Sequence, residues 1–199
     1  VLDRTGMADN TLVIFTSDNG CSPSADFPAL ARLGHRPSHH FRGHKADIFE
    51  GGHRIPLIVR WPARVPAGRR TEETVCLVDL LATCAEWCGA ELPPGSAEDG
   101  ISNLALWEGR PYARPLRATT VHHSIDGSFS IRKGRWKLEL CPGSGGWSPP
   151  RPGPECEGLP PVQLYDLESD IGERRNVAAA HPEIVSELTA LLREQTERE

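Results

Sequence analysis

The chain has 199 residues, 38% hydrophobic and 25% charged, which is long enough and apolar enough for a globular protein with a buried core. A formal net charge of −5 and the lack of any Lys/Arg-rich run argue against a nucleic-acid-binding protein. No stretch approaches the eighteen or so apolar residues of a membrane span. The sequence opens Val1-Leu2-Asp3-Arg4, with neither an initiator methionine nor a signal peptide, and we expect a fragment of a longer protein.

The first sixty residues alternate between strand-like and irregular segments. Residues 11–17 form a β-branched and aromatic run that predicts a strand buried on both faces, as in a parallel sheet. The run ends in the turn sequence Asp18-Asn19-Gly20. An irregular stretch follows from Cys21 to about Gly52, and a loop of this length in a compact domain is usually functional or disordered. Its apolar residues Phe41, Ile48 and Phe49 argue against disorder. A second strand is predicted at 57–61.

The rest of the chain predicts a helical segment followed by an α+β unit. A helix is expected over 74–87, with Leu77, Leu80, Leu81 and Cys84 on one face and Gly89 as its stop. After a loop to about residue 115, the pattern becomes that of an α+β unit. Four antiparallel strands are predicted at 119–123, 128–132, 136–140 and 163–167. A Gly/Pro/Ser loop over 142–161 separates the last two strands. An amphipathic helix is predicted at 181–198. We therefore expect domains at 1–115 and 116–199.

The turn after the first strand offers metal ligands. Asp18 and Asn19 stand where a buried strand ends, which is where open α/β sheets bind their ligands. Their carboxylate and amide carbonyl are hard oxygen donors suited to Ca²⁺ or Mg²⁺. The alternative interpretation is an ordinary Asx turn.

A second group of candidate residues lies in the following loop. Lys45 precedes the double glycine Gly51-Gly52 in a His-rich segment, and a cation there is suited to hold an anionic oxygen. The alternative is a surface lysine. Glu50 and Arg54 are expected to be structural and to tie this turn together.

Together these segments resemble one family. The motifs N-T-L-V-I-F-T-S-D-N-G at 10–20 and G-H-K-A-D-I-F-E-G-G-H-R-I-P-L-I-V-R-W-P at 43–62 closely resemble the type I sulfatases (arylsulfatases). Four later motifs agree with this resemblance: L-V-D-L-L-A-T at 77–83, E-D-G-I-S at 98–102, G-R-W-K-L at 134–138 and Q-L-Y-D-L at 163–167. The resemblance covers essentially the whole chain and matches the C-terminal portion of a sulfatase.

The resemblance implies both a fold and a chemistry. The fold is the C-terminal part of an alkaline-phosphatase-like α/β sandwich followed by a small antiparallel-sheet subdomain with a C-terminal helix. The chemistry is calcium-dependent hydrolysis of an aryl or carbohydrate sulfate by a formylglycine nucleophile. By position, Asp18 and Asn19 match two calcium ligands, and Lys45 matches the lysine that contacts the sulfate group. The remaining calcium ligands are expected upstream of this chain.

Cys21 is not expected to be the formylglycine. Cys21-Ser22-Pro23-Ser24-Ala25 starts like the family's C-x-P-x-R motif, but Ala25 stands in place of the arginine. Asp26-Phe27-Pro28 also does not read as the continuation of a helix, on which the family nucleophile sits. The nucleophile is therefore expected before Val1, and this chain alone is expected to be inactive.

Other residues carry weaker expectations. His122 and His123 are candidates for the substrate rim, with packing on an edge strand as the alternative. Five of the eight histidines lie between 35 and 53 without a defined metal-site spacing, so we interpret them as pocket lining or loop residues. Trp147 is the tryptophan placed to stack on a sugar ring. Cys141 and Cys156 bracket a Gly/Pro-rich segment, which a disulfide between them would close.

Two alternatives to the sulfatase interpretation are kept. One is a phosphodiesterase or phosphatase of the alkaline-phosphatase superfamily, although the K-x-x-x-x-E-G-G pattern is not typical of those enzymes. The other is a non-catalytic remnant that binds calcium or a sulfated glycan. The expected partner is a sulfated small molecule or glycan, with no nucleic acid and no membrane span. The resemblance suggests an exported, periplasmic or lysosomal protein.

Overall fold

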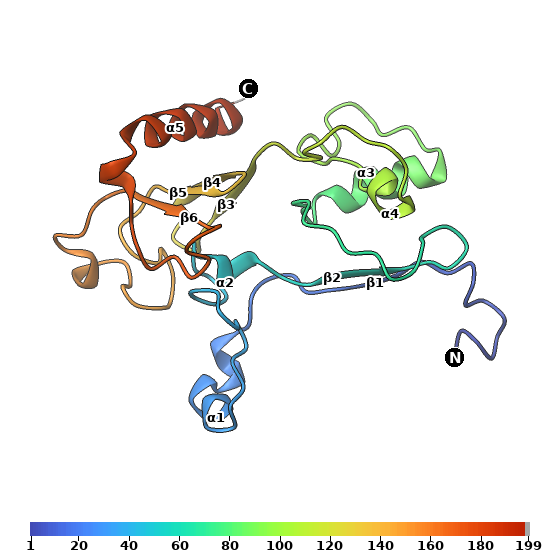
Figure 1. Cartoon of the computed structure of the whole chain (residues 1–199), viewed down its shortest axis with the longest axis horizontal. Helices are drawn as coiled ribbons and strands as arrows, with labels where there is room; N and C mark the ends of the chain where they lie inside the picture. Colours follow the sequence, from blue (N-terminus) through green and yellow to red (C-terminus); the bar gives the residue numbers. More distant parts are fainter. Residues whose placement is uncertain (198–199) are drawn as a thin grey trace. The chain divides into compact units, whose positions relative to one another are not determined.

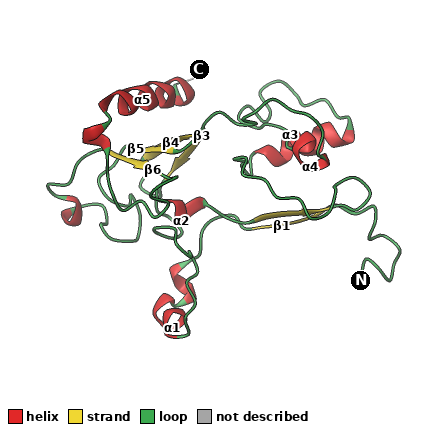
Figure 2. Ribbon diagram, in the orientation of Figure 1, coloured by secondary structure: helices red, strands yellow, loops and turns green. Residues whose placement is uncertain are grey.

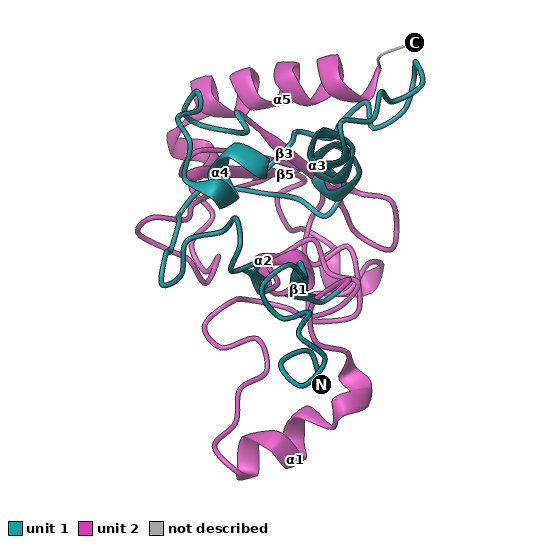
Figure 3. Cartoon of the chain, turned by 90° about the vertical axis from the view of Figure 1, so that its right-hand side faces the viewer, with its two compact units in different colours: residues 1–17, 56–118 teal, residues 18–55, 119–199 magenta. Residues whose placement is uncertain are grey.

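The computed structural model describes residues 1–197 and divides the chain into two compact units. The first unit contains residues 1–17 and 56–118, and the second contains 18–55 and 119–199 (Figure 3). Each unit is therefore discontinuous in sequence, whereas the domains expected from the sequence were continuous. The long loop after the first strand packs with the C-terminal part of the chain, which is the feature that assembles the candidate site.

The first unit contains a two-stranded sheet. Strands β1 (Val13–Thr16) and β2 (Leu57–Arg60) pair antiparallel, with Val13 opposite Arg60. The prediction of a strand buried on both faces in a parallel sheet is wrong for this chain, because Phe15 is 62% exposed and Ile58 is 60% exposed. These two residues are paired across the strands and share one face, which the described residues of the unit leave uncovered.

The helices of the first unit are α3 (Asp79–Cys88) and α4 (Leu104–Glu108). Helix α3 ends as expected at Gly89, which has a φ of 64°. It begins at Asp79 and not at residue 74, because the Asp79 carboxylate accepts the Cys76 backbone N–H at 2.8 Å and so satisfies a donor ahead of the first turn. The predicted apolar face is also wrong: Leu77 and Leu81 are exposed, and the buried residues of the helix are Asp79, Thr83 and Ala85.

The second unit is built on a four-stranded antiparallel sheet in the order β3-β4-β5-β6, which confirms the predicted sheet (Figures 1 and 2). The strands are Thr120–His123, Phe129–Lys133, Trp136–Glu139 and Gln163–Asp166. The predicted helix is α5 (Pro182–Thr196), and residue 198 of that prediction lies outside the described residues. Leu188 and Leu192 of α5 pack against Ile131, Leu138 and Leu164, so α5 covers the apolar face of the sheet.

The opposite face of the same sheet is polar but also buried. The residues that alternate with the apolar ones, among them Ser130, Lys137, Glu139 and Gln163, are buried. They are covered by the segment that contains Ile48, Phe49 and the short helix α2 (Glu50–His53), on the other side of the sheet from α5 (Figure 1). The polar groups on a sheet face that is shielded from solvent need hydrogen-bond partners within the protein.

The long loop carries more helix than its sequence predicts. A 3₁₀ turn at Pro23–Ala25 leads into α1 (Phe27–Arg32), so the expectation that Asp26-Phe27-Pro28 does not continue as a helix is wrong. Pro28 occupies the first turn, where its missing N–H has no helical partner to lose, and the Asp26 side chain caps the Ala29 N–H at 3.1 Å. The other 3₁₀ turns are Pro154–Cys156 and Ala178–Ala180.

Within residues 1–197, each helix falls short of the length and apolarity that a membrane crossing requires.

Candidate functional site

Two backbone hydrogen bonds in the second unit join the turn Asp18-Asn19-Gly20 to the loop over residues 43–52, which contains Lys45 and is called the lysine loop below. The Gly20 N–H donates to the Gly52 carbonyl at 2.9 Å, and the Lys45 N–H donates to the Cys21 carbonyl at 3.0 Å. A Cβ at Gly20 would lie 1.8 Å from the Gly51 carbonyl oxygen, so only glycine allows this approach. The structure thus brings the backbone of Lys45 beside the turn that carries Asp18 and Asn19, although Lys45 lies 26 positions after Asn19 in the sequence.

Asp18 and Asn19 lie just after β1, with Ser17 between the strand and Asp18. Asp18 is exposed and Asn19 is half-buried, with the Asn19 side-chain N–H₂ donating to the Gly20 carbonyl at 3.0 Å. A carboxylate and an amide oxygen suit a hard cation such as Ca²⁺, which takes about six to eight oxygen ligands. Among residues 1–197 no group of three or more His, Cys, Asp or Glu side chains is placed to hold a metal ion. These two residues therefore fit a calcium ion only as part of a larger ligand set.

Asp47 connects the lysine loop to the Gly/Pro/Ser loop over 142–161. Its buried carboxylate accepts the backbone N–H groups of Trp147 at 2.7 Å and Ser148 at 3.0 Å. It also accepts the Ser148 hydroxyl at 2.5 Å and the His44 N–H at 2.8 Å. One carboxylate therefore fixes residues from both loops next to Lys45.

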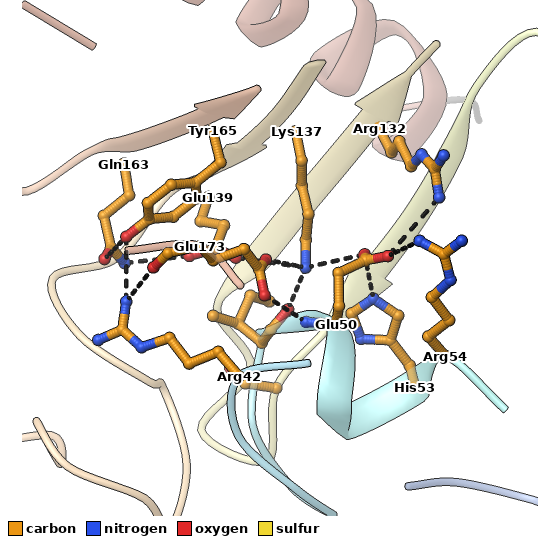
Figure 4. A network of polar contacts seen from close by, with 12 residues as sticks. Arg42, Glu50, His53, Arg54, Arg132, Lys137, Glu139, Gln163, Tyr165 and Glu173 are labelled. Atoms are coloured by element: carbon orange, nitrogen blue, oxygen red, sulfur yellow. Dashed lines mark hydrogen bonds and ion pairs between the residues drawn. The ribbon is translucent and has the colours of Figure 1, made fainter. Parts of the chain in front are cut away.

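Beneath these loops lies a buried ionic network centred on Lys137 (Figure 4). The fully buried Lys137 ammonium extends from β5 and lies 2.7 Å from Glu173, 3.3 Å from Glu50 and 3.3 Å from Glu139. It also donates to the Ile48 carbonyl at 2.9 Å. The network thereby joins the sheet, the lysine loop and the segment that contains Glu173.

Glu50 links this network to the turn at Gly51-Gly52. Its carboxylate contacts Arg54 at 3.0 Å, His53 at 3.3 Å and Arg132 at 3.6 Å. Its backbone N–H donates to the Glu173 carboxylate at 2.7 Å. The expectation that Glu50 and Arg54 tie the turn together is confirmed by these contacts.

The charges in the network determine its protonation. Burial by itself opposes the charged form of Lys137, but the three carboxylates raise its pKa above the ordinary value, so it stays an ammonium. Burial also opposes ionisation of Glu50, yet Lys137 and the neighbouring His53 and Arg132 hold its pKa well below the ordinary value. For Glu139 burial dominates, and its pKa is raised well above the ordinary value. The network therefore pairs Lys137 with ionised Glu50, while Glu139 favours the neutral form.

His122 lies at the edge of this network and His123 lies outside it. The His122 ring stacks on His53, with ring centroids 3.7 Å apart and an interplanar angle of 20°. Burial lowers the pKa of His53 to about 4 and that of His122 well below its ordinary value, so both rings are neutral near pH 7. His122 Nδ1 is buried without a hydrogen-bond partner. His123 is exposed, and its ring lies 6.2 Å from that of Phe129.

The histidines and cysteines that the sequence analysis also considered do not gather in one place. Of the five loop histidines, His53 joins the stack with His122, and His39 and His40 contact each other. Cys21 is half-buried and begins no helix, since α1 starts at Phe27. Cys141 and Cys156 are free thiols in this structure, and burial raises the pKa of Cys141 to about 12.

Sequence reasoning missed the buried charges Lys137, Glu139 and Glu173. The available signal was the alternation of polar and apolar residues in Trp136-Lys137-Leu138-Glu139, which normally indicates a polar face in solvent. Nothing local in the sequence shows that the loop around Glu50 covers that face.

Comparisons with known proteins identify the chain as sulfatase-like. A family model described as Sulfatase matches residues 1–90. N-acetylgalactosamine-6-O-sulfatase of Bacteroides thetaiotaomicron is 36% identical over 197 residues, which cover 96% of this chain and 37% of the relative. Human arylsulfatase A is 32% identical over 200 residues, which cover 94% of this chain and 38% of the relative.

A solved structure shows the same similarity in three dimensions. It comes from work on the metabolism of multiple glycosaminoglycans by Bacteroides thetaiotaomicron and has a TM-score of 0.80 and 34% identity, covering 99% of this chain and 41% of that one. The chain is thus a member of the sulfatase family and corresponds to its C-terminal part. The family resemblance and the alkaline-phosphatase-like fold class predicted from sequence are both confirmed. The chain spans less than half the length of these relatives.

Proposed function

We propose that this chain is the C-terminal part of a calcium-dependent sulfatase that hydrolyses the sulfate ester of an aryl or carbohydrate substrate. The observation that carries the proposal is the pair of backbone bonds, Gly20 to Gly52 and Lys45 to Cys21, that bring the carboxylate–amide turn beside the lysine loop. An anion held between a cation and a metal site is the arrangement that stabilises the spread negative charge of a sulfate group in its transition state.

In this proposal each residue has a separate role. Asp18 and Asn19 supply two oxygen ligands to calcium, which when bound would act as a Lewis acid toward the sulfate oxygens. Lys45 contacts the sulfate group with its ammonium. The remaining calcium ligands and the formylglycine nucleophile come from parts of the protein outside these 199 residues. Cys21 is not the nucleophile, because Ala25 stands where the modification motif has arginine.

His122 and His123 are proposed to contact the substrate at the rim of the site. The support for His122 is that its ring stacks on the ring of His53. His53 directly follows Gly52, and the Gly52 carbonyl accepts the N–H of Gly20 in the turn that carries Asp18 and Asn19. Being neutral, both stacked rings can donate or accept a hydrogen bond without adding charge. The proposed substrate is a sulfated small molecule or glycan, and the proposed location is exported, periplasmic or lysosomal, as the family resemblance suggests.

The role of Lys45 is tested in the complete protein with Lys45→Ala. We expect kcat/KM for a sulfate ester to fall at least about a hundredfold, because one preorganised charge stabilisation in a transition state contributes roughly that much. Lys133→Ala is the matched control, since Lys133 is an exposed strand lysine paired with Glu187. Wild-type-like kcat/KM in a folded Lys45→Ala variant would contradict the assignment.

The 199-residue chain by itself is proposed to lack turnover. Binding energy without a positioned nucleophile does not lower a chemical barrier, and two oxygen ligands hold calcium weakly. Assaying the chain and the complete protein side by side on 4-nitrophenyl sulfate tests this statement. Calcium-dependent hydrolysis by the chain itself would refute it.

A further inference from the structure

Trp147 is exposed although its backbone is firmly held. Its side chain is 44% exposed, in a loop of glycines, prolines and serines. Its N–H is bound to the Asp47 carboxylate at 2.7 Å, and its carbonyl accepts the Arg151 Nε–H at 3.0 Å. Hydrogen bonds therefore fix the backbone of Trp147, while its indole ring is accessible to a ligand.

The residues before Trp147 pack directly on the lysine loop. The Ile48 N–H donates to the Ser144 carbonyl at 2.8 Å. A Cβ at Gly146 would lie 2.5 Å from the Ala46 carbonyl oxygen, so the two segments are in backbone contact. Trp147 consequently keeps a fixed place relative to Lys45, which precedes Ala46 and Asp47 in the chain.

A second exposed apolar residue is anchored to the same segment. The Ile125 N–H donates to the Ala46 carbonyl at 3.0 Å, and Ile125 is 61% exposed. Two large apolar side chains are thus attached through hydrogen bonds to the two residues that follow Lys45. The Cα atoms of Lys45 and Asp47 are two steps of about 3.8 Å apart along the chain, so the backbone to which Trp147 is bound lies close to that of Lys45.

An exposed indole on a fixed backbone is well suited to one kind of ligand. It offers a flat apolar face and a polar N–H at little conformational cost. A pyranose ring has an apolar C–H face and a rim of hydroxyl groups that matches such a surface. Ser148 already bonds Asp47 with its N–H and its hydroxyl, whereas the Arg151 side chain is 59% exposed and offers N–H donors for the hydroxyl groups of a ligand near the indole.

We infer that Trp147 is a specificity-determining residue on which a pyranose ring of a carbohydrate sulfate stacks, at a position adjoining the sulfated group held by Lys45. The inference rests on the proposed function and narrows its substrate from aryl or carbohydrate sulfates to carbohydrate sulfates. The stack contributes to substrate binding and not to the chemical step, so its loss raises KM more than it lowers kcat.

The test compares Trp147→Ala and Trp147→Phe with the wild type in the complete protein. The substrates are a 6-O-sulfated N-acetylgalactosamine disaccharide and 4-nitrophenyl sulfate. For Trp147→Ala we expect KM for the disaccharide to rise about tenfold with kcat within twofold, and values for 4-nitrophenyl sulfate to stay within twofold. Trp147→Phe should restore most of the disaccharide affinity. Leu159→Ala, an exposed apolar change in the same loop, is the control and should change neither substrate.

The outcomes separate this inference from the proposed function. Unchanged disaccharide KM in Trp147→Ala, or an equal loss on both substrates, overturns the stacking role. If the wild type hydrolyses neither substrate, the proposed function fails, and the dissociation constant of the disaccharide measured by NMR titration then decides the inference. A tenfold weaker dissociation constant in Trp147→Ala supports it, and an unchanged or unmeasurable wild-type affinity overturns it.

Discussion

Lys137→Met is the change that most directly tests the buried network. It replaces an ammonium that contacts three carboxylates by an apolar side chain of similar length. Glu173 loses a charged contact at 2.7 Å, and Glu50 keeps Arg54 at 3.0 Å as its nearest cation. Removing one partner from a buried ion pair leaves an uncompensated charge and costs about 3–5 kcal/mol. For a chain of this size that is a fall in Tm of roughly 10 °C.

The assay is urea denaturation followed by circular dichroism, with Lys133→Met as the matched control. Lys133 lies on the neighbouring strand β4 and pairs with Glu187 in solvent, so its replacement should change the free energy of unfolding by less than about 0.5 kcal/mol. Adding Glu173→Gln to Lys137→Met should recover about 1–3 kcal/mol, because it removes the unpaired charge. A Lys137→Met variant within about 1 kcal/mol of the wild type would refute the reasoning.

Three further changes follow from the same structure. Gly20→Ala would place its Cβ 1.8 Å from the Gly51 carbonyl oxygen and should lower the free energy of unfolding by about 3 kcal/mol. Gly127→Ala is the control and should cost about 1 kcal/mol, because no atom lies within 4 Å of the added Cβ. Equal losses in urea denaturation would contradict this prediction. Burial holds the pKa of His53 at about 4, below its ordinary value of 6.5. Between these two pH values the unfolded state therefore binds more protons than the folded state. The free energy of unfolding should fall as the pH drops from 6.5 to 4, by at most about 3 kcal/mol. His53→Asn should flatten that slope in a pH series of thermal melts, and an unchanged slope would count against it. Asp47→Asn weakens a carboxylate that accepts from Trp147, Ser148 and His44, so limited proteolysis of the loop over 142–161 should become faster, whereas an unaltered cleavage rate would show that Asp47 does not hold the loop.

The sequence predicts the local structure of the second unit well. Period-2 alternation and a Gly-containing connection give the four strands, with Gly134 at a φ of 57° in the turn between β4 and β5. The apolar spacing of Leu188 and Leu192 gives helix α5. Motifs around Asp18 and Lys45 also identify the family, because they combine unusual residue types at fixed separations.

What the sequence does not predict is which distant segments cover which faces. The polar face of β5 resembles a solvent-exposed face until residues 47–54 are placed over it, and that placement depends on Glu173, 36 residues after Lys137. Similarly, the run from Val13 to Thr16 is apolar enough for a strand buried on both faces, yet Phe15 is exposed in this chain. Hydrophobic patterning reports what a strand is able to bury, whereas burial itself is decided by segments far away in the sequence.

The most direct test of the sulfatase proposal is a calcium titration of sulfate-ester hydrolysis by the complete protein, with Asp18→Ala as the variant and Asp126→Ala as a control carboxylate. Asp126 accepts hydrogen bonds from Ser124 and Ser128 and is assigned no ligand role. We predict hydrolysis that requires calcium, with a half-saturating calcium concentration at least about tenfold higher in Asp18→Ala, since a carboxylate is a principal ligand for this ion. Hydrolysis that is indifferent to calcium, or a calcium dependence that Asp18→Ala leaves unchanged, would contradict the proposal.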